Sequence, residues 1–386
     1  MGEDKSKKRK RTAAPAQPST STSDADIDTS KPTAIYTPRA PRPHTLSLAL
    51  PGSIISNAQT HDLRTALAGT IARACAVFSI DEIVIFNDGT ATPRRSAHQG
   101  RDFESESNYT GVSDPGGFLQ HLLEYLECPP HLRTRLFALH PNLRTAGALP
   151  SCDMPHHLRG EEWCAWREGV TVPPPAGEAG GKKKKRKGAD ATDAPGPSYV
   201  DVGLGALVAV PDAIPPHTRV TVKLPASPPA GFPGALEQME GKAVDPATPR
   251  EQEGYYWGYA VRRAASLAKV FTECAFEGGY DVSIGTSERG VPVETVLPGG
   301  PGAVRKVPKT FKHAVIVVGG VAGLEVAVEA DEELKEMGIG KGNVGSLFDY
   351  WVDVCPGQGS RTIRAEEAVW ITLAQLRTWA HGGVGV

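Results

Sequence analysis

The chain has 386 residues, of which 40% are hydrophobic and 22% are charged, and its formal net charge is -2. These values are ordinary for a globular protein. The length predicts two domains with tails, because a single core rarely grows beyond about 250 to 300 residues. No apolar run approaches the roughly 18 residues that a membrane-spanning helix needs, which argues against a membrane-embedded chain. The six cysteines form no C-x-x-C pair and no secretory signal precedes them, so we expect reduced thiols in a soluble, intracellular protein.

Basic charge is concentrated in two short runs, Lys7–Arg11 and Lys182–Lys187. Residues 1–43 combine the first run with Ser, Thr, Pro and Ala and almost no aromatic residues, which predicts a disordered basic tail. Together with Lys5, the first run is typical of a nuclear localisation signal, and a solvated tail is the alternative. The second run has three open interpretations: phosphate binding by counterion release, a second nuclear signal, or a solvated loop.

The ordered chain is predicted to begin at residue 44 with a β-α-β unit. Residues 46–50 alternate as in a strand, residues 59–78 have the apolar spacing of a helix, and residues 83–86 form a short apolar strand of the buried parallel type. The apolar face predicted for the helix consists of Leu63, Leu67, Ile71, Ala74, Cys75 and Phe78.

A polar, turn-rich stretch separates this unit from a second predicted helix, residues 118–126. From residue 129 to 254 the chain is rich in Pro, Gly and Val. Its short strand-like pieces, separated by turn residues, predict a small antiparallel barrel or sandwich. Those pieces are residues 169–172, 199–202, 206–210 and 219–224. Residues 173–197, which contain the lysine run, are predicted to be a disordered loop between two of the strands.

Helical spacing returns at residue 255 and predicts a helix through residue 271. Three strands then follow, each ending in a loop of small residues, and open α/β sheets bind ligands at such loops. Residues 44–128 and 255–386 are therefore predicted to form one α/β domain, which residues 129–254 interrupt. The strands are 280–284, 313–318 and 348–354, and their loops are Gly285–Gly290, Gly319–Gly323 and Cys355–Arg364.

The third loop is the strongest candidate for a ligand site. It runs from a strand into a helix that opens at Ala365, and its glycines let a ligand approach the backbone N–H groups closely. Arg361 and Arg364 within this loop favour an anionic partner. A dinucleotide cofactor is less favoured, because Gly319–Gly323 matches G-x-G-x-x-G only in part.

Short motifs spread in order over residues 44–376 are similar to those of one known family. Together they resemble the SPOUT-domain, or α/β-knot, RNA methyltransferase family that includes human centromere protein 32. The match covers nearly all of the chain that is predicted to be ordered. The motifs are Ser47–Ser53, Asn57–Gln59, Ile71–Cys75, Asp81–Val84, Tyr125–Pro129, Pro155–His157, Tyr256–Tyr259, Gly285–Gly290, Gly319-Gly320 and Cys355–Arg364.

The resemblance implies an α/β-knot fold with a C-terminal trefoil knot, an inserted OB-like β-barrel, a homodimer, and S-adenosylmethionine as cofactor. Periodicity alone cannot show a knot, which is a rare exception among folds. In such proteins the cofactor lies among three loops, and an adenine needs an apolar slot with a few fixed polar groups. The cofactor-binding residues that the resemblance implies are Thr286, Val318, Gly319, Gly320, Val354, Cys355, Pro356, Gly357, Gln358, Gly359, Ser360 and Ile363.

Three side chains are predicted to be catalytic. In the superfamily that the chain resembles, an arginine of the first helix often reaches the partner's active site. Arg73, nearly opposite the apolar stripe of that helix, is the first choice for substrate contact, and a solvated helix arginine is the alternative. Glu288 and Arg289 lie beside the expected position of the methyl donor.

Three further arginines, Arg64, Arg361 and Arg364, are predicted to contact RNA. Arg364 has an alternative, an ion pair with Glu367 at i,i+3. Ser360–Thr362 stands where the commoner superfamily pattern has Ser-Leu-Asn, so the role of that asparagine is not carried over.

One cluster has the residue types of a zinc site, namely Cys152, His156, His157 and Cys164. Its spacing matches no standard finger, so we predict no metal. A structural or RNA-facing role is expected for the two histidines.

The leading hypothesis is an S-adenosylmethionine-dependent RNA methyltransferase of the nucleus, most plausibly of the nucleolus. By resemblance, the substrate is large-subunit ribosomal RNA and the acceptor is N3 of uridine. The alternative is a non-catalytic RNA-binding factor of ribosome assembly or the kinetochore that retains the fold. Intact glycines in the second and third loops favour a working cofactor site.

Overall fold

The computed structural model describes residues 38, 40–90, 109–175, 197–234, 236–302 and 304–381. The predicted basic tail, apart from its last few residues, and the Lys182–Lys187 run both lie outside these ranges. No helix within them is long and apolar enough to cross a bilayer.

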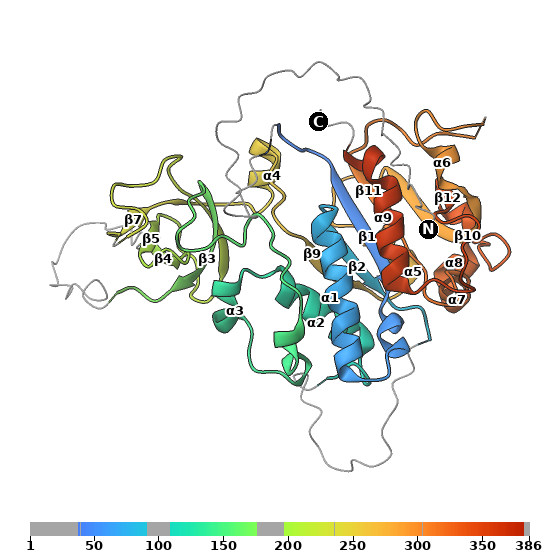
Figure 1. The fold of residues 1–386 in the computed structure, drawn as a ribbon, viewed down its shortest axis with the longest axis horizontal. Helices are drawn as coiled ribbons and strands as arrows, with labels where there is room; N and C mark the ends of the chain where they lie inside the picture. The colour runs from blue at the N-terminus through green and yellow to red at the C-terminus, as the bar shows by residue number, and fades with distance from the viewer. Residues whose placement is uncertain are drawn as a thin grey trace, which may run out of the picture. The chain divides into compact units, whose positions relative to one another are not determined.

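A parallel six-stranded sheet forms the larger part of the described chain (Figure 1). Its strand order is β12-β10-β11-β1-β2-β9, and all neighbouring strands run parallel. Every residue of β1 and β2 is buried, as expected for interior strands of a parallel sheet that is covered on both faces. The strands are β1 (Thr45–Pro51), β2 (Glu82–Phe86), β9 (Ala260–Ala264), β10 (Val282–Pro292), β11 (His313–Val317) and β12 (Tyr350–Asp353).

Helices cover both faces of this sheet, so the fold is mixed α/β. Because successive strand residues face opposite sides, Leu48 joins the core beneath α1, α2 and α9, whereas Ala49 joins the core beneath α5, α7 and α8. Figure 1 shows α9 beside α1, where the indole N–H of Trp370 donates to the carbonyl of Thr70 (3.2 Å). These helices are α1 (His61–Val77), α2 (Pro115–Glu127), α5 (Leu267–Thr272), α7 (Glu325–Ala330), α8 (Glu332–Glu336) and α9 (Ala365–His381).

Local capping fixes where the three long helices begin. Thr60 Oγ1 accepts the N–H of Leu63 at the start of α1, and the Asp114 carboxylate accepts the N–H of Gly117 at the start of α2. At α9 the carboxylate of Glu367 accepts the N–H of residue 364 (2.9 Å), which is one half of a capping box. The remaining helical segments are α3 (Pro130–Leu136), α4 (Thr248–Glu253), α6 (Val293–Val296), and the 3-10 turns η1 (Gly52–Asn57), η2 (Pro141–Leu143), η3 (Ala146–Ala148) and η4 (Val344–Leu347).

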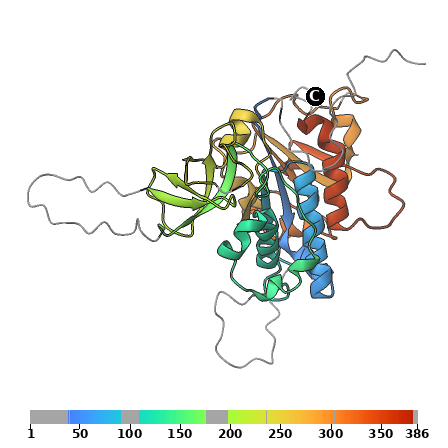
Figure 2. The same cartoon turned by 60° about the vertical axis from the view of Figure 1, so that its left-hand side comes forward.

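A second, mainly antiparallel sheet is formed by residues 166–244, drawn from green to yellow in Figure 2. Its order is β7-β5-β4-β3-β6-β8, and only β5 and β7 pair in parallel. The four predicted strands of this region are confirmed. The strands are β3 (Trp166–Val172), β4 (Ser198–Asp201), β5 (Leu207–Val210), β6 (Arg219–Lys223), β7 (Met239–Glu240) and β8 (Lys242–Val244).

The two edges of this second sheet are joined by a single glycine. Gly241 lies between β7 and β8, and its N–H donates to the carbonyl of Ala209 (3.0 Å). A Cβ on Gly241 would lie 2.6 Å from Val208 and 2.7 Å from Val222, so the position has no room for a side chain. One continuous segment therefore pairs with both edges and closes the sheet on itself.

Two predictions on helices are wrong. Residues 255–271 do not form one helix: they contain strand β9 and the short helix α5. Gly258 has φ of +86°, which a helix does not allow, and the hydroxyl of Tyr259 donates to the carbonyl of Leu123 (3.0 Å). On α1, Leu63 is 56% exposed, because it lies in the first turn, before the helix reaches the core.

Candidate active site

The carboxyl ends of β10, β11 and β12 lie side by side, because β10 is the neighbour of both other strands. Gly285 of β10 is paired with Val317 of β11 on one side and with Trp351 of β12 on the other. The three predicted loops therefore lie at one edge of the sheet. This is the edge at which open parallel sheets bind ligands.

The first loop is a bulge inside β10. Thr286 and Val291 are both paired with Val352 of β12, so residues 287–290 protrude between them. Thr286 is buried, which holds the base of the bulge in the sheet. The predicted start of this loop at Gly285 is wrong, because Gly285 is paired on both sides within the sheet.

The second loop is a tight turn after β11. The N–H of Gly323 donates to the carbonyl of Gly320 (2.9 Å), and a Cβ on Gly319 would lie 2.8 Å from the backbone of Gly323. Gly320 is less crowded: among the described atoms, an added Cβ would meet only Pro51 (3.6 Å) and the carboxylate of Asp88 (4.0 Å). The backbone of Gly320 thus borders free space beside a buried carboxylate.

The third loop is held by its own backbone. The N–H of Cys355 donates to the carboxylate of Asp353 (2.9 Å), and the N–H of Gln358 donates to the carbonyl of Cys355 (3.2 Å). Gly357 has φ of +73°, a conformation that favours glycine. A Cβ added at Gly357 or Gly359 would have no described atom within 4 Å, so both glycines leave their backbone open.

The other predicted cofactor residues divide into an apolar and a polar group. Val318 and Val354 are buried, and Ile363 is half-buried. Pro356 and Ser360 are exposed. The twelve predicted residues thus lie on the three neighbouring loops, with apolar side chains at the base and accessible backbone above them.

The predicted catalytic residues do not all lie at this edge. Glu288 and Arg289 belong to the bulge of β10, and Arg289 forms an ion pair with Glu325 (3.0 Å). Arg73 lies in the second half of α1, where its guanidinium donates to the carbonyls of Ser151 (3.2 Å) and Cys152 (2.8 Å) of its own chain. Its predicted substrate contact stays a prediction.

Of the predicted RNA-binding arginines, Arg64 lies in the first turn of α1, and Arg361 and Arg364 lie on the third loop. Arg64 donates to a backbone carbonyl just before α1 (3.0 Å). Arg361 is exposed, and Arg364, with a side chain 77% exposed, is 3.9 Å from Glu366. The alternative pairing of Arg364 with Glu367 takes a different form, since Glu367 accepts the backbone N–H of Arg364 rather than its guanidinium.

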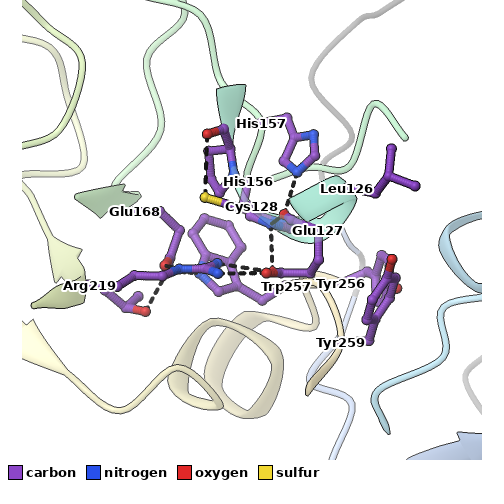
Figure 3. Close-up of polar contacts among 12 residues, drawn as sticks. Leu126, Glu127, Cys128, His156, His157, Glu168, Arg219, Tyr256, Trp257 and Tyr259 are labelled. Carbon is purple, nitrogen blue, oxygen red and sulfur yellow. Dashed lines mark hydrogen bonds and ion pairs between the residues drawn. The ribbon is translucent and has the colours of Figure 1, made fainter. Parts of the chain in front are cut away.

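The histidines of the zinc-like cluster belong to a buried polar network instead (Figure 3). His156 Nε2 lies 3.0 Å from the carboxylate of Glu127, and His157 Nε2 lies 2.7 Å from the carbonyl of the same residue. Within the described residues, no group of three or more His, Cys, Asp or Glu is arranged to hold a metal ion. The structural role expected for the two histidines is therefore the one that the contacts support.

The same network joins the two sheets. Arg219 of β6 binds Glu127, at the end of α2, through both terminal nitrogens, and Glu168 of β3 through Nε (2.7 Å). Glu168 also accepts the indole N–H of Trp257 (2.7 Å). Burial alone would raise the pKa of Glu127, but Arg219 and the hydrogen bond with His156 outweigh it and hold that pKa well below its usual range. We call Glu127, Glu168 and Arg219 the carboxylate clasp.

Two of the cavities in the described part of the chain lie outside the three loops. One, of about 260 Å³, is at the carboxyl ends of β1, β2 and β9, and its lining includes Ser53, Asp114 and Arg263. The other, of about 880 Å³, lies between β6 and β8 of the second sheet and the amino ends of β1 and β2. Sequence reasoning missed the first cavity. One available signal was Asn87, a polar residue directly after the buried strand β2, at the ligand-binding edge.

An open parallel sheet with helices on both faces, and with glycine-lined loops at its carboxyl edge, defines an α/β protein built to bind a small ligand at that edge. Residues 45–376 match the family model described as "Putative RNA methyltransferase". The chain belongs to this RNA methyltransferase family.

Its relatives carry a more specific name. The 28S rRNA (uridine-N(3))-methyltransferase of Homo sapiens is 42% identical over 340 residues, which are 87% of this chain and 78% of the human protein. The proteins of the same name from Mus musculus (42%, with 87% and 77% covered) and Drosophila melanogaster (40% over 342 residues, with 87% and 62% covered) are also similar.

Proposed function

We propose that this RNA methyltransferase uses S-adenosylmethionine to methylate N3 of uridine in large-subunit ribosomal RNA. The observation that carries the proposal is that the three glycine-containing loops leave neighbouring strands at one edge of the sheet. The names of the relatives support the choice of uridine N3 and of 28S rRNA.

The three loops fit an adenosyl group. Gly357 and Gly359 leave backbone N–H and carbonyl groups open for an adenine, and buried Val318 and Val354 supply the apolar base that a flat ring needs. Free space beside Gly320 suits the methionine portion. When bound, the cofactor supplies a methyl group from its sulfonium. The residues proposed to hold it are the twelve of the three loops, and Glu288 and Arg289 flank them.

We further propose the α/β-knot, or SPOUT, architecture of the branch that includes human centromere protein 32. Residues 44–128 and 255–386 would form the knotted domain, with residues 129–254 inserted. The strand pairing in the second sheet supports an OB-like barrel: of its six strands, β7 and β8 belong to one continuous segment that closes the sheet through Gly241, and β5 and β7 form one parallel pair. A homodimer that packs through α1 is supported by two exposed apolar side chains, Leu63 and Val77. They are 14 residues apart and therefore lie on the same side of the helix.

RNA is proposed to contact the β3–β4 connection and the third loop. The connection between the first two strands of an OB-like barrel is a common nucleic-acid contact, and here it contains Lys182–Lys187. Arg361 and Arg364 would meet RNA phosphates beside the cofactor, and Arg73 and Arg64 would lie on the dimer partner's side. Localisation to the nucleus and nucleolus is part of the same proposal.

Calorimetry with S-adenosylmethionine, followed by a methyl-transfer assay on 28S rRNA fragments, tests this function. We expect cofactor binding in the micromolar range that enzymes commonly show for their substrates, and 3-methyluridine in the product. Absence of binding at millimolar cofactor would leave the competing reading, a non-catalytic RNA-binding assembly factor, as the better one.

A further inference from the structure

The cavity of about 260 Å³ lies next to the second loop. Ser53, after β1, is part of its lining, and the Ser53 hydroxyl donates a hydrogen bond to the carboxylate of Asp88 (2.5 Å). That carboxylate is in turn 4.0 Å from the position of a Cβ on Gly320. The Ser53–Asp88 pair therefore lies at the border that the cavity shares with the turn proposed to bind the methionine portion of the cofactor.

The size and lining of the cavity suit one flat base. At roughly 30 Å³ for each water, it would hold about nine water molecules, which is the scale of a pyrimidine ring with its substituents. Ile85, Phe86 and Pro115 supply apolar walls, and Ser53 and Asn87 supply polar groups. Small-molecule sites combine apolar walls with a few polar groups in this way.

One wall of the cavity supplies hydrogen-bond donors to its contents. Arg263 of β9 is bound by both oxygens of Asp114 (2.7 and 3.1 Å), which use two of its five N–H groups and leave three for a ligand. Asp114 is also the N-cap of α2, so the positive end of this 13-residue helix borders the same space. The side chain of Arg263 is 50% exposed, so a ligand can reach it.

We propose that this cavity receives the uracil base of the acceptor nucleotide. In it, Arg263 donates to a carbonyl oxygen of uracil, and the Ser53–Asp88 pair accepts the proton of N3. The assignment deepens the proposed function, on which it rests, because it supplies the proton acceptor that methylation of uridine N3 requires.

The proton transfer balances as follows. The N3–H bond breaks and its electron pair stays on N3. The proton passes to Ser53 Oγ while the hydroxyl proton of Ser53 passes to Asp88. The negative charge left on uracil spreads over N3 and the two carbonyl oxygens, where Arg263 and the start of α2 stabilise it. Cytosine has no proton on N3 and carries an amino group in place of one carbonyl, so the same groups disfavour it.

Binding of uridine 5′-monophosphate to the full chain without cofactor tests the pocket. Saturation-transfer NMR should show uracil protons in contact with the protein, with weaker signals for cytidine 5′-monophosphate and none for ribose 5-phosphate. Arg263→Ala should weaken uridine monophosphate binding roughly ten- to hundredfold, as expected for loss of a charged hydrogen bond. The matched control is Arg135→Ala, because Arg135 and Asp201 form a pair of similar exposure in the other sheet region. Equal affinity in wild type and Arg263→Ala would overturn the assignment, as would equal binding of ribose 5-phosphate.

A ligand without the N3 proton, 3-methyluridine 5′-monophosphate, tests whether Ser53 accepts a hydrogen bond from N3 or only contacts the base. Wild type should bind it roughly five- to tenfold more weakly than uridine monophosphate, and Ser53→Ala should lose this preference. A preference that persists in Ser53→Ala would remove Ser53 as the acceptor.

Asp88→Asn should keep uridine monophosphate binding within about threefold but lower methyl transfer roughly 100-fold or more. Asp81→Asn, at the opposite end of β2, is its control and should change stability rather than turnover. Normal turnover in Asp88→Asn would overturn the role of Asp88. Failure of the proposed function is distinguishable, because wild type would then bind no S-adenosylmethionine, whatever the nucleotide experiments show.

Discussion

At the scale of single residues, Gly319 and Gly320 are neighbours with different constraints. Gly319 is required by the fold, since a Cβ there would lie 2.8 Å from the backbone of Gly323. Gly320 is required by nothing in the described structure, because an added Cβ would make only ordinary contacts at 3.6 and 4.0 Å. A glycine without a structural reason at a ligand-binding edge indicates that the ligand itself needs the space.

This contrast predicts a graded result at Gly320. Gly320→Ala should fold normally and weaken S-adenosylmethionine binding by about tenfold or less, whereas Gly320→Trp should abolish binding that calorimetry can detect and leave the melting temperature within a few degrees of wild type. The indole would occupy the free space beside Asp88 without displacing the backbone.

The control for this series is Gly342→Trp, in the segment that leads back to β12, where an added Cβ also meets open space. It should leave cofactor affinity unchanged. Normal affinity in Gly320→Trp would show that the cofactor pocket lies elsewhere.

At the scale of elements, the carboxylate clasp is the main polar connection between the helix layer of the parallel sheet and the closed sheet of β3–β8. Glu168 is 3% exposed and Glu127 is also buried, and Arg219 is the cation that both share. Removing one partner of a buried ion pair costs more than the pair contributes, because the remaining charge is left without compensation.

Arg219→Met should therefore lower the free energy of unfolding by about 3 kcal/mol, the lower part of the range for broken buried pairs, since Arg219 is partly solvated. Urea denaturation measures this loss. Arg135→Met breaks a more exposed pair between α3 and β4 and should cost less than about 1 kcal/mol. Similar losses in the two variants would mean that the clasp does not hold the sheets together.

Prediction of the parallel strands from sequence succeeded except at one edge strand, β9. β2 and β11 contain continuous apolar runs, which are typical of interior parallel strands, and β1 has a leucine at every second position. β9 is an edge strand whose Arg262 and Arg263 bind carboxylates on different elements, Glu82 and Asp114. Its apolar residues recur at helical spacing only by coincidence, so periodicity predicted a helix there.

At the scale of the whole molecule, sequence patterns are local, and this explains which part of the site could be predicted. The three loops follow recognisable strands, so sequence motifs located them. The cavity is built from Ser53, Asn87, Asp114 and Arg263, which are far apart in the chain and meet only because β1, β2 and β9 are neighbours. No local sequence pattern shows that β1, β2 and β9 are neighbours in the sheet. The carboxylate clasp could not be predicted for the same reason: Glu127 lies in the motif Tyr125–Pro129, but Glu168 and Arg219 come from two later strands.

The whole molecule should also lose stability in mild acid. Burial lowers the pKa of His157 to about 3 and, with smaller contributions from nearby charges, the pKa values of His44 and His121 to about 4. Between about pH 6.5 and these values the unfolded chain binds protons that the folded chain does not. The contribution of these histidines to the free energy of unfolding is therefore full above about pH 6.5 and falls as the pH decreases towards 4. For His157 alone the fall is up to about 1.4 kcal/mol per pH unit.

His157→Gln separates this contribution from general acid effects. A glutamine amide can still donate to the carbonyl of Glu127, the partner of His157 Nε2 at 2.7 Å, but it binds no proton in this range. Urea unfolding at pH 7, 6 and 5 should therefore show a shallower fall of stability with acid in His157→Gln than in wild type. His217→Asn, at an exposed position, should retain the wild-type slope. A parallel fall in His157→Gln and wild type would mean that His157 already takes up its proton in the folded chain. The histidine would then not be the group through which the network around Glu127 responds to pH.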